Sequence, residues 1–397
     1  MKSAVRHILL LYIGISCIGT LWAQQLDTID FFKEPFIFDK STTPQIQIEG
    51  ETNENSINAF YKHIESEGYD RLVHQLRTFK QQKGLNDWLY YQLIRQVSES
   101  ISPKSDDYHR YTLYKWYLMN KSGYDARLAV GDGQVIFYIK NKEDISDIPF
   151  FVIDGQQFTC LNYHDYGRLF KRADVYRPVS IRVPGAEGHF SYKIAEMPEF
   201  KDESYAVKNV NFQYQDKVYE FDIKVNDHVA GIFKNYPGVD FETYFNIPLT
   251  KVTYQSLIPV LRDNIKEMDT KGGVDYLMRF TRYAFLYEND DINFGIEKRL
   301  SPEQTLINNY SDCDDRAALF FFLVKEIYNL PMIAILYPTH ITMAVQFEHK
   351  IGDAIEYEGQ YFSICEPTPQ GQNLNIGELA DKYKNEKYKI VYHYRPR

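Results

Sequence analysis

The feature that most constrains the fold of this 397-residue chain is an internal repeat. The segment SDDYHR at 105–110 returns as SDCDDR at 311–316, and a leucine follows each at the same distance. Further along, DGQQFTCLN at 154–162 matches EGQYFSICE at 358–366 at nearly the same spacing. A weaker match relates two helical segments upstream of these. Because the matches keep the same order along the chain, we expect a duplication that produces two copies of one fold.

Each copy combines helical patterns with strand patterns. Apolar residues recur at helical spacing in 55–100, 250–290 and 313–330. Strand patterns follow these helices, at 126–162 in the first copy and at 332–366 in the second. The sequence therefore predicts an α+β fold class for both copies.

The region between the two copies has a different character. Residues 170–235 read as alternating strands separated by turns rich in Gly, Pro, Asp and Lys. This pattern is typical of a small β-sandwich or meander. We therefore expect a first copy at 24–165, a β-sandwich-like domain at 166–245 and a second copy at 246–397.

The N-terminus has the pattern of an export signal. Lys2 and Arg6 precede a mostly apolar run at 8–22, and a small residue follows at a suitable cleavage position. We expect a signal peptide at 1–23, so that the mature protein is periplasmic or secreted and has no membrane span. A lipid anchor at Cys17 is the less favoured alternative, because the residues before it fit a lipoprotein signal poorly.

Charge and cysteine content narrow the class of function further. The net charge is −9 and no basic stripe is present, which argues against binding to nucleic acid. Three cysteines remain after the signal peptide, Cys160, Cys313 and Cys365. An odd number of thiols in an exported protein of this size is not a disulfide scaffold. One of the three is therefore a candidate reactive group, and we expect Cys160 and Cys365 to be buried in the core.

Cys313 stands where a predicted helix begins. The segment 317–324 is apolar on every face, which predicts a helix buried in a core. The unpaired amides and the dipole at the start of a helix favour a thiolate there. Acidic neighbours such as Asp314 cap the helix and oppose the thiolate, so the dipole and a nearby histidine must outweigh them. The alternative interpretation is a buried thiol without function.

Two further residues complete a thiol triad in sequence order. His340 opens a predicted strand, and Glu366 closes a later one. A histidine in this position serves as the base, and the acid orients its ring. Asp312 and Asp314 are alternative acids, but each is adjacent to the cysteine and poorly placed to hold the far nitrogen of the ring.

The stretch 311–368, with SDCDDRAALFFFLV, HITMAVQF and YFSICEPT, resembles the transglutaminase-like superfamily. The resemblance implies a papain-like α+β core with Cys313 as nucleophile, His340 as base and Glu366 as orienting acid. The family usually has Asp at the third position, so Glu366 is a departure that requires a shifted backbone. Together with the repeat, this implies two papain-like, transglutaminase-like copies that flank the small all-β domain.

The first copy lacks the candidate catalytic residues. The spacing of the repeat places Asp107 at the position of Cys313, Gln134 near that of His340 and Asn162 opposite Glu366. All three positions have lost their chemistry together. We therefore expect a catalytically inactive duplicate that binds, supports or occludes the second copy.

The function expected from these features is an exported cysteine hydrolase or acyl transferase that acts on peptide or amide bonds through a thioester. Its partner is a peptide or protein substrate, and no organic cofactor is implied. Cys313, Cys365 and His340 do not have the spacing of a zinc signature, so no metal is expected either. The rival hypothesis is a non-catalytic binding or scaffold protein of the cell envelope. A third is acyl transfer from a small thioester donor.

Overall fold

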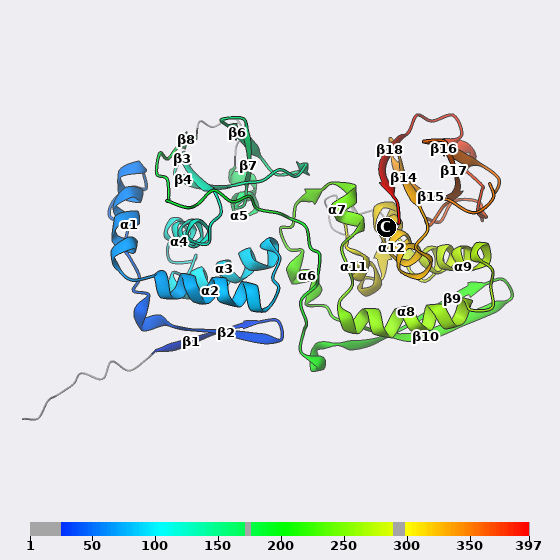
Figure 1. Ribbon diagram of the computed structural model, residues 1–397, viewed down its shortest axis with the longest axis horizontal. Coiled ribbons are helices and arrows are strands. Elements are labelled where there is room, and N and C mark those ends of the chain that lie inside the picture. The colour runs from blue at the N-terminus through cyan, green and yellow to red at the C-terminus, as the bar shows by residue number, and fades with distance from the viewer. Residues whose placement is uncertain (1–24, 171–175, 289–297, 397) are drawn as a thin grey trace, which may run out of the picture.

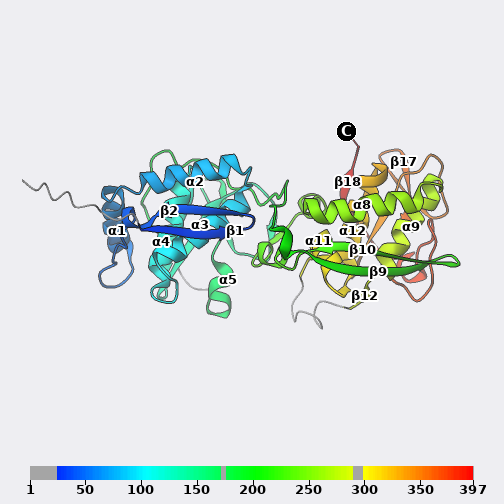
Figure 2. The ribbon, with the colours of Figure 1, turned by 90° about the horizontal axis from the view of Figure 1, so that it is seen from below.

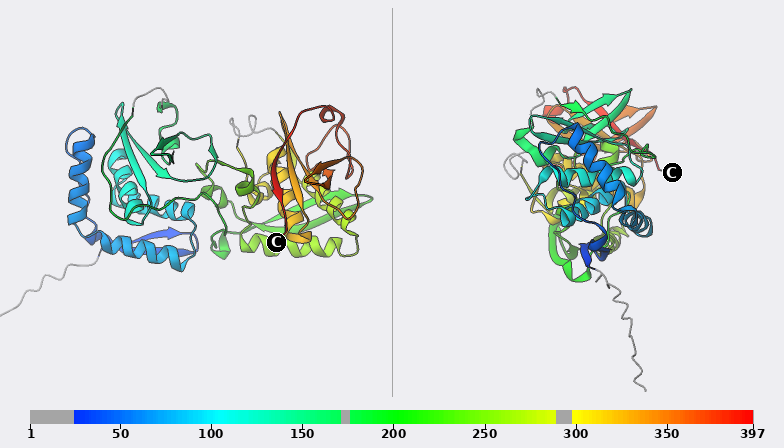
Figure 3. Two further views of the ribbon diagram at one scale, coloured as in Figure 1. Left: turned by 45° about the horizontal axis from the view of Figure 1, so that its top comes forward. Right: turned by 90° about the vertical axis from the view of Figure 1, so that its left-hand side faces the viewer.

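The computed structural model describes residues 25–170, 176–288 and 298–396. The expected signal peptide at 1–23, with Cys17, lies outside the described residues. The described part of the chain is a mixed α+β structure of two halves that lie side by side along the long axis (Figures 1 and 3). Within it, no helix has the length and apolar character that a membrane crossing requires.

Each half contains a curled five-stranded sheet, and the two sheets have the same strand order. The order is β6-β7-β4-β3-β8 in the first half and β16-β17-β15-β14-β18 in the second, with antiparallel neighbours throughout. The strands of the first sheet are β3 (Ala126–Gly131), β4 (Gln134–Lys140), β6 (Phe150–Ile153), β7 (Gln156–Cys160) and β8 (Arg177–Pro178). Those of the second are β14 (Met332–Tyr337), β15 (His340–Val345), β16 (Ala354–Tyr357), β17 (Gln360–Cys365) and β18 (Lys389–Tyr394).

Helices cover one side of each sheet, as Figure 1 shows. The first half has α1 (Glu54–Ser66), α2 (Asp70–Gln82), α3 (Asp87–Ile101) and α4 (Tyr108–Lys121). The second half has α8 (Lys251–Ile265), α9 (Thr270–Tyr283), α11 (Pro302–Ile307) and α12 (Cys313–Tyr328). The central helix α12 is buried from Asp315 to Val324, as its apolar sequence predicts, and it ends at Asn329 in the left-handed conformation.

A β-hairpin lies against the helices of each half, on the side away from the sheet (Figures 1 and 2). The hairpins are β1 (Leu26–Phe31) with β2 (Glu34–Asp39), and β9 (Ala206–Tyr214) with β10 (Lys217–Val225). In the first half β2 contacts α2 and β1 contacts α3. In the second half β10 contacts α8 and β9 contacts α9 in the same way.

The prediction of a small all-β domain at 166–245 is therefore wrong. In the described part of this region, the long strands β9 and β10 pair with each other and pack on α8 and α9. A hairpin with one face on helices and the other in water shows the same alternation of apolar and polar residues as a strand of a sandwich. The repeat in the second half thus begins with the β9-β10 hairpin, and not at residue 246.

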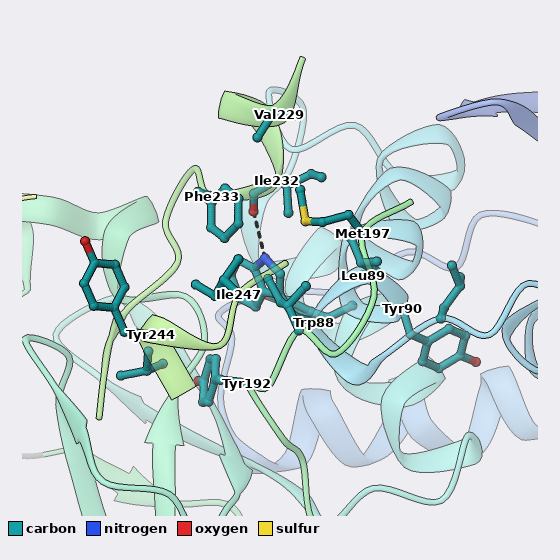
Figure 4. Close-up of a cluster of buried hydrophobic side chains, with 14 of the residues drawn as sticks. Trp88, Leu89, Tyr90, Tyr192, Met197, Val229, Ile232, Phe233, Tyr244 and Ile247 are labelled. Carbon is teal, nitrogen blue, oxygen red and sulfur yellow. Dashed lines mark hydrogen bonds between the residues drawn. The ribbon is translucent and has the colours of Figure 1, made fainter. Parts of the chain in front are cut away.

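An apolar junction joins the two halves (Figure 4). Trp88 of α3 is buried there, and its Nε1 donates to the carbonyl oxygen of Ile232 at 2.7 Å, at the end of α6 (Val229–Ile232). The rings of Tyr192 and Tyr236 pack on Trp88. Both halves share one continuous apolar core through this junction. Shorter elements are β5 (Ile145–Ser146), which pairs with β11 (Gly238–Val239), α5 (Tyr163–Tyr166) and α7 (Phe241–Phe245).

Candidate active site

Cys313 is the first residue of α12, as predicted. Asp312 caps the helix, because its side chain accepts the amides of Asp314 and Asp315. The thiol is half-buried, and its Sγ lies 3.5 Å from Oδ1 of Asp314. The backbone amide of Ile341 also donates to the sulfur, so the start of α12 rests against the start of β15.

The electrostatic surroundings of Cys313 differ from the expectation of a stabilised thiolate. Burial raises the pKa of the thiol well above its usual value, and the carboxylates of Asp314 and Asp312 raise it further. The Ile341 amide acts in the opposite direction but is outweighed. Burial and the nearby acids therefore prevail over the helix dipole, and the resting thiol is neutral.

The structure brings His340 and Glu366 together. His340 is the first residue of β15, and Glu366 directly follows β17, the neighbouring antiparallel strand. Both residues therefore lie at the same end of these two strands. Nε2 of His340 lies 2.8 Å from Oε2 of Glu366, and both residues are buried. The other oxygen of Glu366 accepts the amide of Thr368 at 2.9 Å. Glu366, and neither of the alternative acids Asp312 and Asp314, is the partner of the histidine.

The contact with Glu366 assigns the two ring nitrogens of His340. The carboxylate accepts a hydrogen bond from Nε2–H, which leaves Nδ1 as the nitrogen that can act as a base. Within the described part of the chain, no hydrogen bond joins the Cys313 sulfur to this ring. Instead the sulfur faces Asp314, whose carboxylate also pairs with Arg299 at 3.2 Å.

Two side chains that support the His340–Glu366 pair carried no signal in the sequence. The ring of Tyr383 stacks on the imidazole with centroids 4.8 Å apart and planes at 7°. Arg282, fully buried, donates from Nε to the carbonyl oxygen of Glu366 at 3.1 Å and from Nη1 to that of Leu374 at 2.8 Å. Tyr383 and Leu374 belong to the irregular segment between β17 and β18, which has no periodic pattern to read.

Arg316 fixes the start of α12 to the preceding helix. Its guanidinium is fully buried and donates to the carbonyl oxygens of Ser311, Thr281, Arg282 and Phe285. In the first half Arg110 reaches back in the same direction, and its Nε donates to Ser102 just after α3 at 2.8 Å. Each arginine therefore fixes the start of its helix to the segment before it.

Tyr287 is a further residue near the thiol. It lies in β12 (Leu286–Tyr287), which pairs in parallel with β13 (Tyr310–Ser311) immediately before the N-cap of α12. Burial raises the pKa of Tyr287 to about 12, and the charge of Cys313 contributes in the same direction. Tyr287 is nevertheless 45% exposed.

Strand register fixes the equivalent positions in the first half. Gly131 pairs with Gln134 across a two-residue turn, as Tyr337 does with His340. Gln134 therefore occupies the position in the first half that His340 occupies in the second. The pairing of β4 with β7 likewise makes Asn162 the equivalent of Glu366. Both predictions are confirmed.

The third position was predicted with an error of one residue. Asp107 is the N-cap of α4, as Asp312 is of α12, so Tyr108 and not Asp107 occupies the place of Cys313. The Tyr108 hydroxyl donates to Asp165 at 2.8 Å and accepts the amide of Asn162. A hydrogen-bonded phenol thus stands at the start of α4, where α12 has the thiol.

A buried lysine lies beside this altered site. Lys115 is fully buried, 3.6 Å from Oδ2 of Asp165 and 4.3 Å from the ring centre of Tyr111. Burial lowers the pKa of Lys115 to about 7, while Asp165 opposes that change. The first half has therefore filled the equivalent position with a polar network.

The two other cysteines of the described chain lie in the interior. Cys160 and Cys365 are buried free thiols, as expected for core residues. Among the described residues, no group of three His, Cys, Asp or Glu side chains is arranged to hold a metal ion. No protein-family model, no curated protein and no solved structure matches this chain.

Proposed function

We propose that this chain is an exported cysteine-dependent hydrolase of peptide or amide bonds, with Cys313 as nucleophile, His340 as base and Glu366 as orienting acid. The observation that carries the proposal is the buried 2.8 Å contact between His340 and Glu366 at the edge of β15, against which the helix of Cys313 begins. A thiol at a helix start beside a His–acid pair is the arrangement of the transglutaminase-like enzymes that the sequence resembles. The duplicated α+β halves support the same assignment, with the first as an inactive copy.

The neutral resting thiol points to general-base activation. As Sγ of Cys313 attacks the carbonyl carbon, Nδ1 of His340 takes the thiol proton. The carbonyl oxygen gains the negative charge. The backbone amide of Cys313 at the helix start has no partner among the residues that the structure describes, and it can donate to this oxygen. The phenol of Tyr287 is the side chain best placed to be a second donor.

In the later steps of the proposed cycle, the proton passes to the leaving amine and the free thiol of Cys313 is regenerated. The imidazolium of His340 gives its proton to the leaving amine, the C–N bond breaks, and a thioester forms on Cys313. Water then attacks the thioester, Nδ1 again takes a proton, and the sulfur leaves as the thiol. Glu366 holds Nε2–H throughout, so the same nitrogen faces the reaction in both steps.

The acceptor decides between hydrolysis and transfer. If an amine replaces water at the thioester, the product is a new amide and the enzyme is a transferase. Incubating the full chain with a mixed peptide and protein library, with and without a biotin-labelled primary amine, distinguishes the two by mass spectrometry. We expect new peptide termini in the absence of the amine and little label incorporated in its presence.

Cys313→Ala and Cys365→Ala are the matched pair of controls for this experiment, since each removes one thiol. Cleavage should disappear in Cys313→Ala and persist in Cys365→Ala. Cleavage that survives in Cys313→Ala would overturn the proposal.

One observation favours the rival function of a non-catalytic binding protein. Among the described residues, the Cys313 sulfur contacts the carboxylate of Asp314 and makes no hydrogen bond to the imidazole of His340. The Asp314 carboxylate disfavours a thiolate. A binding protein would show neither cleavage nor acylation of Cys313 with any substrate. The library experiment therefore separates the two functions.

A further inference from the structure

A polar pocket of about 670 Å³ lies on the second half, away from the Cys313 sulfur. Its walls come from three places: the tip of β9, one face of α9, and the irregular segment between β17 and β18. Every side chain that lines it can form hydrogen bonds, through amide, phenol, carboxylate or guanidinium groups. We propose that this pocket binds a neutral carbohydrate.

The floor of the pocket is a buried, charge-balanced group. Arg279 is 8% exposed, and its guanidinium donates to Asn375 at 2.9 Å and also to Asn373. Asp275, one helical turn earlier on α9, pairs with Arg279 at 3.4 Å. Because the one positive charge faces one negative charge, the pocket presents no net charge to a ligand.

Asn373 has its amide orientation fixed by its neighbours. Its Oδ1 accepts from three donors: Arg279, Arg282 at 3.3 Å and the hydroxyl of Tyr283 at 2.8 Å. The Nδ2 group makes no hydrogen bond within the described part of the chain, and neither does Oε1 of Gln213, on the opposite wall. The pocket thus offers an oriented donor and an acceptor that are free to bind a ligand.

These features select the class of ligand. A charged ligand would have to disturb the pair between Arg279 and Asp275, and an apolar side chain would leave the surrounding polar groups without water or partners. A sugar brings several hydroxyl groups, each of which both donates and accepts, and carries no charge. The exposed ring of Tyr283, at 43%, can pack on the C–H face of a pyranose.

The pocket is connected to the candidate active site through one arginine. Arg282 donates both to Asn373 at the pocket and to the carbonyl oxygen of Glu366. The pocket is thus one side chain away from the backbone of Glu366, and its lining does not include Cys313 or His340. Binding at the pocket does not depend on the catalytic proposal.

Isothermal titration of the full chain tests the proposal. The neutral probes are cellobiose, maltose, lactose and N,N′-diacetylchitobiose, with glucuronate, glucosamine and a neutral tripeptide as competitors of other classes. We expect at least one neutral disaccharide to bind. Gln213→Ala should weaken that binding about fivefold, because it removes one hydrogen bond worth ~1 kcal/mol. Asp275→Asn should weaken it to a similar extent, because the charge of Arg279 is then no longer balanced.

Two control variants locate the binding. Gln156→Ala changes an exposed glutamine of β7, which lies in the first half and outside the pocket, and should leave affinity unchanged. Cys313→Ala should also bind normally, which separates this result from the catalytic proposal. The inference is overturned if no neutral disaccharide binds, if a charged sugar or the tripeptide binds more tightly, or if both pocket variants bind as the unmodified chain does.

Discussion

At residue 313, burial and neighbouring acids keep the thiol protonated despite its position at a helix start. The pKa is raised first by burial and then by Asp314 and Asp312. A cysteine in this state needs a base at the moment of attack, and does not depend on a thiolate formed in advance. In the proposed mechanism, the ring nitrogen of His340 that faces away from Glu366 is this base.

The tautomer of His340 is therefore a first testable consequence. Because Glu366 accepts from Nε2, we expect the neutral ring to carry its proton on Nε2 and to leave Nδ1 bare. The ¹⁵N shifts of the ring nitrogens measure this directly. In Glu366→Asp the shorter side chain no longer reaches the ring, and the two tautomers should mix. A ring protonated on Nδ1 in the unmodified chain would contradict the assignment.

Lys115 gives a second prediction, on stability against pH. Its pKa of about 7 in the folded chain lies below the value of 10.5 for an exposed lysine. Between these values the unfolded chain holds more protons, so the contribution of Lys115 to the free energy of unfolding rises by about 1.4 kcal/mol per pH unit. Urea unfolding at pH 7, 8 and 9 should show this slope in the difference between the unmodified chain and Lys115→Met.

The exposed Lys62 of α1 provides the control for this measurement. In Lys62→Met the stability difference from the unmodified chain should not change with pH. A difference for Lys115→Met that is equally flat from pH 7 to 9 would show that the lysine is not held in the low-pKa state.

Residues in periodic elements could be predicted from sequence, and those in irregular segments could not. Cys313, His340 and Glu366 each stand at the end of a helix or strand, where the change of pattern marks them. Tyr383 contacts His340 from an irregular segment, and Arg282 contacts Glu366 from a helix face that sequence spacing does not relate to the site. The pairing of Glu366 with His340 depends on the adjacency of β15 and β17 in the sheet, which the sequence does not show.

At the level of elements, the β9-β10 hairpin explains why the small all-β domain was a wrong prediction. The start of α4 explains the error of one residue in the position equivalent to Cys313. The alternating pattern of β9 and β10 indicates strands correctly, but it cannot tell whether the apolar face meets a second sheet or a pair of helices. Similarly, the repeat aligns Arg110 with Arg316, but α4 begins one residue later than α12 relative to this arginine. A shift in a helix cap is set by local hydrogen bonds and is invisible in a sequence match.

The two caps form a matched pair for experiment. Asp312→Ala and Asp107→Ala each remove the side chain that accepts the first helical amides, and each should lower the free energy of unfolding by ~1 kcal/mol. Only Asp312→Ala also removes a negative charge near the thiol, so only this variant should lower the pKa of Cys313. The pH dependence of alkylation of Cys313 by iodoacetamide measures that difference. Equal alkylation profiles for both variants would contradict the electrostatic role of Asp312.

At the scale of the whole molecule, two halves of common topology share one apolar core. The repeat in the sequence predicts the two sheets, yet it gives no information on how the halves meet. Trp88 lies at this contact and bonds to Ile232 across it (Figure 4). The first half therefore contacts the second through a buried interface, and it lacks counterparts of Cys313, His340 and Glu366.

This interface predicts cooperative unfolding. We expect a single calorimetric transition for the unmodified chain, and a loss of about 3–5 kcal/mol in Trp88→Ala, with the halves unfolding separately. Trp116→Ala is the control, because Trp116 is equally buried but bonds within the first half, to Ala126. This variant should lower stability without separating the halves. Two transitions in the unmodified chain would contradict the shared core.

The central claim is that His340 activates Cys313 for acyl transfer, and the most direct test is acylation by p-nitrophenyl acetate. This activated ester requires no knowledge of the natural substrate. We predict a burst of p-nitrophenolate, an acetyl group on Cys313 in the mass spectrum, and a rate that falls about 10²–10⁴-fold in His340→Ala. Acetylation of Cys313 at the same rate in His340→Ala, or no acetylation of Cys313 at all, would contradict the account.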